Sequence, residues 1–276
     1  MAWVICAVAP AAFTAETAAP DASAAAVAEA PPATTAAGAE ATAETVMSCM
    51  RGNVPQQLRL RELVVRTEEA DGDVRTLRAR MYVMREEGRA MVTMHVESPS
   101  EVRGTSYLWR ELETRDETFV FIPELNRVRR VIGSGADSGV MDSEFSMRDL
   151  QQVQGSFSSG VQHYLGEGTV EGRNVWKMRF EPGEAEPTSY THVLADVDQM
   201  RCVTLRADFV DEKGVVKHFS AQAESLTESD GIAYARHVRM DNRRSGRKSF
   251  AEITQLEAPD DLPRRIFLPN AFYLGR

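Results

Sequence analysis

The sequence predicts a mainly β, α+β protein built on one curled antiparallel sheet of about eleven strands that short helices cover. Strand-like segments of roughly eight to twelve residues follow one another between turn signals. The regular alternation of strands and helices that indicates a parallel sheet is missing. Helical patterns occur near residues 44–58 and 142–153. A meander of this size must curl or close to protect its edges.

The chain divides into three expected parts. Residues 1–15 are apolar and end in small residues, as in a signal peptide. Residues 16–45 are dominated by Ala with Pro, Thr and Glu, and they offer no aromatic residue to a core. This composition predicts a disordered linker. Residues 46–276 are the expected folded domain, because 43% of the chain is hydrophobic, enough for a substantial core.

The apolar start favours export, although it lacks the basic n-region of an ordinary signal peptide. This lack suggests a start internal to a longer leader. A membrane anchor is disfavoured because the apolar run is shorter than about 20 residues. Lipidation of Cys6 is disfavoured because Trp3, Val4 and Ile5 precede it where small residues are expected.

The strands begin with a hairpin. The segments Arg59–Glu69 and Val74–Arg85 flank Asp71-Gly72, a strong signal for a tight turn. Later segments share β-branched and aromatic residues bounded by turn residues. They are Arg89–Glu97, Tyr107–Glu111, Asp116–Ile122, Val161–Val170, Asn174–Glu181, Ser189–Val197, Arg201–Val210, Val215–Ala223, Ile232–Asp241 and Lys248–Leu256.

Apolar and polar residues alternate along several strands, so each of these strands has one inner face. The inner rows are Leu77, Ala79, Met81 and Val83, then Ala90, Val92, Met94 and Val96, then Asn174, Trp176, Met178 and Phe180. Such a face either fills with side chains or encloses a cavity. Methionines are frequent in these strands, and methionine suits surfaces that receive apolar ligands of variable shape, but it also fills irregular cores. On the residues alone the filled core is favoured.

Residues 103–150 have a distinctive order of two strands, a tight basic corner, a glycine-rich loop and a short polar helix. The corner is Arg127–Arg130, and the glycines of residues 133–139 allow backbone turns that a side chain would forbid.

This segment resembles the outer membrane lipoprotein-sorting proteins, the LolA/LolB-like group of the Gram-negative periplasm. The family pattern runs P-x-x-x-x-G-T-x-x-L, a strand ending in Y/F-x-P-x-L, V-R-R, a small-residue loop and G-S-D-F-x-x-x-D-L. Weaker similarity extends from about Glu44 to the C-terminus. Asp142 and Glu144 stand where the family tends to have glycine and aspartate. The matching residues are Pro99, Gly104, Thr105, Leu108, Phe121, Pro123, Leu125, Val128, Arg129, Arg130, Ser143, Phe145, Asp149 and Leu150.

The resemblance implies a half-open barrel that holds acyl chains between sheet and helices, and it favours a cavity over a filled core. The expected cavity residues are Leu77, Met81, Val83, Val92, Met94, Phe119, Phe121, Trp176, Met178 and Phe180. The expected lid or loop residues are Arg129, Arg130, Gly139, Met141, Phe145 and Asp149. Two roles stay open for Arg129 and Arg130, which could pin the glycine loop or contact a carboxylate or lipid headgroup.

Two cysteines remain after a leader that contains Cys6 is set aside. Cys49 and Cys202 form an even pair for an oxidising compartment. A disulfide is open at this point, because a lone cysteine in a strand such as residues 201–210 is more often a small core residue.

The composition argues against several other functions. The net charge is −9, and the arginine clusters lack the interleaved aromatic residues that stack on bases, so nucleic acid is not an expected partner. The five histidines are scattered singly, and neither a G-x-S-x-G elbow nor a phosphate loop is present. Asp142, Glu144 and Asp149 are better explained as helix caps and N-terminal charges than as general acids or bases. The sequence therefore predicts neither catalytic residues nor a metal or cofactor.

The expected function is a non-enzymatic periplasmic carrier that binds a lipid or lipoprotein acyl chains, with residues 133–150 as a movable lid. The resemblance implies further partners in an inner-membrane transporter and an outer-membrane acceptor. The alternative is an envelope protein-protein interaction module, such as a stress sensor or transporter accessory, which a filled interior and an exposed apolar patch would favour. A hydrolase is least favoured because its motifs are missing.

Overall fold

The computed structural model describes residues 41–113, 116–132, 137, 139–153, 160–183 and 188–274. The chain divides into two units, residues 1–39 and 40–276, and the description concerns the second. The predicted signal peptide and most of the predicted linker lie outside the described residues, as do Gly133 and Gly135.

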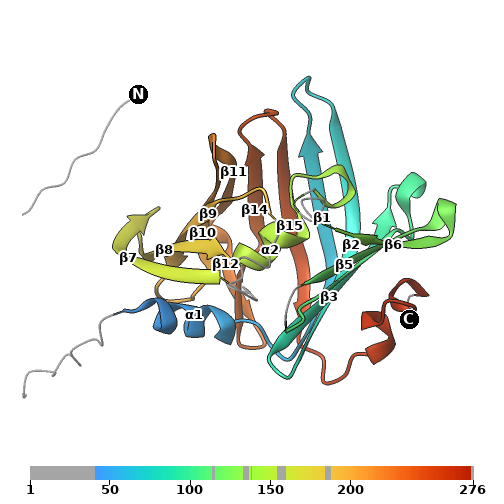
Figure 1. Ribbon diagram of the computed structural model, residues 1–276, viewed down its shortest axis with the longest axis horizontal. Coiled ribbons are helices and arrows are strands. Elements are labelled where there is room, and N and C mark those ends of the chain that lie inside the picture. The colour runs from blue at the N-terminus through green and yellow to red at the C-terminus, as the bar shows by residue number, and fades with distance from the viewer. Residues whose placement is uncertain are drawn as a thin grey trace, which may run out of the picture. The chain divides into compact units, whose positions relative to one another are not determined.

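Within the described residues, thirteen strands form one antiparallel sheet that curls without closing into a regular barrel (Figure 1). The order is β6-β5-β4-β3-β2-β1-β15-β14-β11-β10-β9-β8-β7, so β6 and β7 are the open edges. The prediction of a mainly β, curled antiparallel fold is confirmed. The strands are β1 (Gln57–Glu68), β2 (Val74–Glu86), β3 (Arg89–Ser98), β4 (Ser106–Arg110), β5 (Glu117–Ile122), β6 (Arg127–Val131), β7 (Gly160–Val170), β8 (Arg173–Pro182), β9 (His192–Asp198), β10 (Thr204–Asp211), β11 (Gly214–Ala221), β14 (His237–Asn242) and β15 (Lys248–Glu257).

Two α-helices occur in the described part of the chain, α1 (Ala43–Gly52) and α2 (Met147–Val153). Thr42 caps α1 by accepting a hydrogen bond from the Thr45 amide at 3.2 Å, so the helix begins before residue 46, where we placed the start of the folded domain. Both helices are shorter than predicted. Short 3₁₀ helices add η1 (Ser100–Val102), η2 (Pro123–Leu125), η4 (Val140–Asp142), η5 (Ala223–Ser225), η6 (Arg264–Phe267) and η7 (Phe272–Leu274).

The prediction of a basic corner at Arg127–Arg130 is wrong. The chain turns earlier, at η2, where Asn126 adopts a left-handed conformation with φ of 44°, and the arginines then form β6. An edge strand tolerates this charge because one side of it faces solvent.

The predicted strand Ile232–Asp241 is also divided. Its first part is β13 (Ile232–Ala235), which pairs with β12 (Leu226–Ser229) in a separate two-stranded sheet, and its second part is β14. The strand count was therefore too low.

A bulge in β1 shifts the inner face of that strand. The register with β2 breaks between Leu60 and Leu63, so the inner row passes from Leu58 and Leu60 to Leu63 and Val65. These four side chains are at most 9% exposed. A strict alternation of inner and outer residues does not hold along this strand.

The C-terminal segment covers the outer face of β3–β5. Thr93 Oγ1 donates to the Ile266 carbonyl at 2.6 Å, and His95 Nε2 donates to the Phe272 carbonyl at 2.7 Å. Phe121 stacks on Tyr273 with ring centroids 4.1 Å apart. A second apolar cluster forms here, separate from the main core on the concave face. Its buried members are Met84, Leu108, Leu262, Ile266, Phe267 and Phe272.

We expect acidification to weaken this C-terminal docking. Burial lowers the pKa of His95 below its usual value of 6.5, and the charge of Arg80 adds to this, while the Phe272 carbonyl and Glu97 partly oppose it. Because the pKa of His95 is depressed in the folded state, the stability that neutral His95 contributes is fully present above about pH 6.5. It is lost as the pH falls through the folded-state pKa. Urea unfolding of His95→Gln across this range should show a smaller loss of stability than the wild type. The exposed His163→Gln is the control, and an equal loss in wild type and His95→Gln would contradict the assignment.

Candidate ligand-binding site

An apolar pocket of about 190 Å³ lies between the concave face of the sheet and the segment that contains α2, which crosses the sheet in Figure 1. Seven strands of the large sheet (β1, β2, β3, β10, β11, β14 and β15) and both α-helices contribute to its wall, together with β13. Its lining includes Met50, Leu58, Leu60, Leu63, Val65, Leu77, Met81, Val83, Met94, Val140, Phe145, Leu150, Val153, Cys202, Thr204, Phe219, Ala221, Ile232, Val238, Ala251, Ile253 and Leu256.

The structure brings part of the predicted cavity set together at this pocket. Leu77, Met81, Val83 and Met94 line it, as does Phe145 from the predicted lid. Others belong to the same apolar core without lining the pocket. These are Val92, Trp176, Met178 and Phe180, of which Met178 and Phe180 are at most 2% exposed.

Phe119 and Phe121, which we expected at the cavity, pack in the outer cluster under the C-terminal segment. Cross-strand pairing explains this placement. Met94 lies opposite Tyr107, and Tyr107 lies opposite Val120, so the inner row of β5 consists of the even-numbered residues.

A larger pocket of about 660 Å³ opens over this inner row. It shares Val140 with the apolar pocket, so the η4 segment separates the two spaces. A third space of about 610 Å³, over β1 and β2, shares Glu101 and Val102 with the larger pocket. Drug-sized ligands occupy roughly 300–1,000 Å³, so the two open pockets can take a ligand as they stand, whereas the inner pocket holds only part of one.

The segment between the pockets is held closely. A Cβ atom at Gly139 would collide with the Ser143 carbonyl, so this glycine is required by close approach and not, as we expected, by an unusual turn. Asp142 has φ of 62°, the left-handed region that glycine, asparagine and aspartate tolerate best. This conformation explains why a family with glycine at the position can accept aspartate.

Asp149 lies in a buried charged cluster that fixes α2. Its backbone amide and side chain exchange hydrogen bonds with Ser146 at 2.9 and 3.0 Å, which caps the helix as predicted. Its carboxylate also accepts from Lys217 Nζ at 2.8 Å and from the Tyr190 hydroxyl at 3.0 Å. Burial, reinforced by the charges of Asp149 and Asp137, raises the pKa of Tyr190 and keeps its hydroxyl a donor.

Next to this cluster, Arg148 Nε lies 2.7 Å from Asp137 Oδ1. Asp137 also accepts from the Ser189 amide at 2.8 Å. Glu144 is held by Arg247 at 3.0 Å and by Asn242 at 2.8 Å. Sequence reasoning missed the distant partners of Asp149 and Glu144, because these partners come from strands and loops far from α2 along the chain. They are Lys217, Tyr190, Arg247 and Asn242.

The two predicted loop arginines lie on opposite faces of β6. Arg130 pairs with Glu117 at 2.8 Å on the outer face, and Arg129 lies opposite Val120 on the inner face. The residue that pairs with Asp149 is Lys217. Met141 lies in η4.

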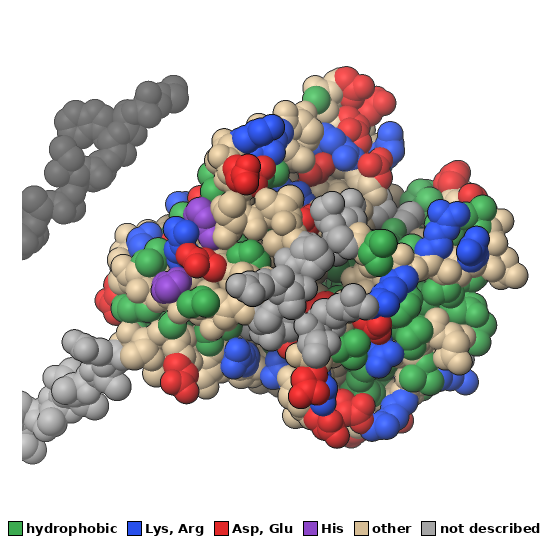
Figure 2. Space-filling view, in the orientation of Figure 1, with side chains coloured by type: hydrophobic (Ala, Val, Ile, Leu, Met, Phe, Trp, Pro, Cys, Tyr) green, Lys and Arg blue, Asp and Glu red, His purple; other side chains and the backbone are tan. Residues whose placement is uncertain are grey.

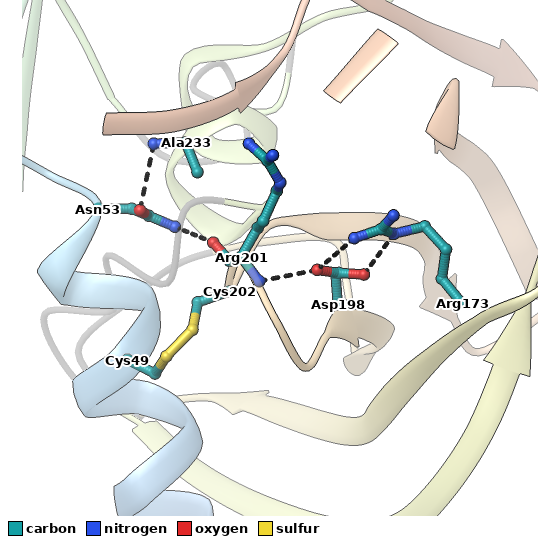
Figure 3. The surroundings of a disulfide bond; sticks show 7 residues. All are labelled: Cys49, Asn53, Arg173, Asp198, Arg201, Cys202 and Ala233. Carbon is teal, nitrogen blue, oxygen red and sulfur yellow. Dashed lines mark hydrogen bonds and ion pairs between the residues drawn. A yellow bond between two sulfur atoms is a disulfide. The ribbon is translucent and has the colours of Figure 1, made fainter. Parts of the chain in front are cut away.

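Cys49 and Cys202 form a disulfide with their Cα atoms 5.7 Å apart, which resolves the alternative that the sequence left open (Figure 3). Cys202 lies in the turn before β10, with φ of 54°, and not in a strand. Asn53 donates to the Arg201 carbonyl and accepts from the Ala233 amide, so α1 is joined to the β9–β10 turn at a second point. The disulfide therefore fixes the end of the pocket that Met50 and Cys202 line.

No group of three or more His, Cys, Asp or Glu side chains in the described part of the chain is placed to hold a metal ion. None of the helices described here is both long enough and apolar enough to span a membrane.

Comparison with known proteins gives the following likenesses. A family model described as an uncharacterized protein matches residues 88–273. No curated protein matches the sequence. A DUF1329 family protein from Desulfovibrio piger superposes with a TM-score of 0.75 at 23% identity, covering 83% of this chain and 96% of that one.

Two further crystal structures share the fold. A proposed outer membrane lipoprotein-sorting protein domain from Vibrio parahaemolyticus has a TM-score of 0.74 at 20% identity, covering 84% of this chain and 99% of that one. A LolA superfamily protein from Nitrosomonas europaea has a TM-score of 0.63 at 18% identity, covering 83% of this chain and 98% of that one. At these identities the likeness establishes the fold, which confirms the predicted LolA-like architecture.

Proposed function

Because the chain belongs to the family whose model matches residues 88–273 and has the LolA-like fold, we propose that it is a non-enzymatic periplasmic carrier. It binds a lipid, or the acyl chains of a lipoprotein, in its hydrophobic cavity for sorting to the outer membrane. The observation that carries this proposal is the apolar pocket on the concave face, which lies next to two larger open pockets.

The chemistry of the pocket suits an acyl chain. Its wall is made almost entirely of aliphatic, aromatic and methionine side chains, with few polar groups that would need a partner. Each CH₂ group moved from water into such a wall contributes about 0.8 kcal/mol. Methionines at positions 50, 81 and 94 can change rotamer as the inner pocket widens from 190 Å³.

The movable lid is part of the same proposal. Opening of the segment around η4 and α2 would join the inner pocket to the 660 Å³ pocket, since Val140 lines both of them. The ion pairs of Asp142, Glu144 and Asp149 hold the segment against the sheet, so the lid opens only when some of these pairs break. An inner-membrane transporter and an outer-membrane acceptor are the proposed partners for loading and delivery.

Native mass spectrometry of protein purified from the periplasm, followed by lipid extraction, tests the proposal. A co-purifying acylated species at one per chain is the expected result, and it would identify the cargo class. Protein that carries no ligand and ignores added fatty acid and lipopeptide would contradict a carrier and leave the envelope interaction module as the better account.

Substitution of a pocket residue is expected to weaken acyl binding at least tenfold. Met94→Asp places a charge where the side chain is 3% exposed, and Ala251→Phe fills the pocket without adding a polar group. The measurement is titration of a fluorescent fatty acid, with circular dichroism to confirm the fold. Met200→Asp is the matched control, because Met200 is 85% exposed. Unchanged binding by both folded pocket variants would place the acyl chain elsewhere.

A further inference from the structure

We propose that Arg129, at the open edge of the sheet, binds the anionic headgroup of an acylated lipid whose chain lies in the 660 Å³ pocket. This inference rests on the proposed function, since it names the class of ligand that the same site takes.

Strand register places Arg129 on the pocket's face. In β6, Arg129 lies opposite Val120 and Val131 lies opposite Thr118. Val120, Thr118 and Val131 all line the pocket. Residues directly opposite in a sheet share a face, as do residues two apart in a strand, so Arg129 lies on the same face of the sheet as these lining residues.

Arg129, like Arg127 opposite Ile122 on the same face, differs from the engaged arginines near this pocket. It is exposed, and it makes no ion pair or side-chain hydrogen bond with the described residues. Arg130 is engaged on the opposite face by Glu117 at 2.8 Å. Arg103 lines the pocket, but its Nε is held by the Glu97 carbonyl at 2.9 Å.

Two acidic residues also line this pocket. Glu101 is in η1, where its carboxylate accepts from Ser100 at 3.1 Å, and Glu124 is in η2. On the side where Figure 1 places β5 and β6, Figure 2 shows hydrophobic side chains beside Lys and Arg. An exposed arginine and an apolar pocket wall therefore meet at this edge of the sheet.

A guanidinium group matches the geometry of a phosphate through two parallel hydrogen bonds. Its aliphatic stem can also extend the apolar wall while the charged end reaches water. An apolar pocket of this volume with an exposed arginine on its face of the sheet fits a ligand that has an acyl chain and a phosphate close together. An arginine on an edge strand also deters edge-to-edge pairing, but Arg130 on the same strand serves that purpose equally.

Two lysophospholipids with the same acyl chain provide the test. Lysophosphatidylglycerol has a net negative headgroup and lysophosphatidylcholine a neutral one, and each is titrated into the full protein against a bound fluorescent fatty acid. We expect about fivefold tighter binding of lysophosphatidylglycerol, with the preference reduced by high salt. Arg129→Gln should remove the preference for lysophosphatidylglycerol over lysophosphatidylcholine, whose choline cation opposes a nearby guanidinium, and Arg130→Gln should keep the preference.

Equal binding of the two lipids by the wild type, or a preference that survives Arg129→Gln, would overturn the headgroup assignment while leaving the carrier intact. A loss of preference in Arg130→Gln equal to that in Arg129→Gln would reduce the effect to general surface charge. If neither lipid displaces the probe from the wild type, the proposed function itself fails.

Discussion

Replacing Lys217 with methionine is expected to lower the free energy of unfolding by about 3–5 kcal/mol, because the change leaves a buried carboxylate without its cation. The Lys217 side chain is 7% exposed, and that of Asp149 is fully buried. Tyr190 and the Ser146 amide would still donate to Asp149, but they carry no charge to balance it.

Lys177→Met is the matched control for this experiment. Lys177 pairs with Asp196 at 3.0 Å, close to the 2.8 Å of the buried pair, but its side chain is 45% exposed. Exposed pairs of this kind contribute at most about 1 kcal/mol. Urea unfolding followed by circular dichroism measures both variants, and similar losses in the two would mean that Asp149 is not enclosed as the structure places it.

The inner rows of β2 and β3 could be predicted from sequence because Met81, Val83, Val92 and Met94 alternate with polar residues. In β2 the outer row is polar because solvent reaches Arg78, and in β3 it is polar because Thr93 and His95 hydrogen bond to the C-terminal segment. In β5 both rows are apolar, since the C-terminal segment covers the outer face, and Phe119 was therefore assigned to the wrong side. No pattern within β5 distinguishes the two faces.

The buried partners of α2 could not be predicted for a different reason. Asp149 was identified from a local motif, and its capping role follows from Ser146 three residues earlier. Lys217 lies 68 residues away and Tyr190 lies 41 residues away, and only the curl of the sheet brings them to the helix. The Cys49–Cys202 pair spans 153 residues, so sequence spacing left it open in the same way.

Removing that disulfide with Cys49→Ala and Cys202→Ala is expected to lower the free energy of unfolding by about 2–5 kcal/mol. A crosslink over a loop this long restricts the unfolded chain strongly, and in the chain-entropy account the effect approaches about 5 kcal/mol. The fold itself should persist. Val46, Met47 and Met50 of α1 are at most 3% exposed, so apolar burial continues to hold the helix against the sheet.

Chemical unfolding with and without a reductant separates the crosslink from the side chains. The wild type should lose stability when reduced, and the double alanine variant should be insensitive to the reductant. If thiol titration shows full reduction of the wild type without a loss of stability, the bond contributes no restraint. Because Met50 and Cys202 both line the apolar pocket, a loosened α1 should also weaken fatty acid binding at the proposed site in the reduced protein.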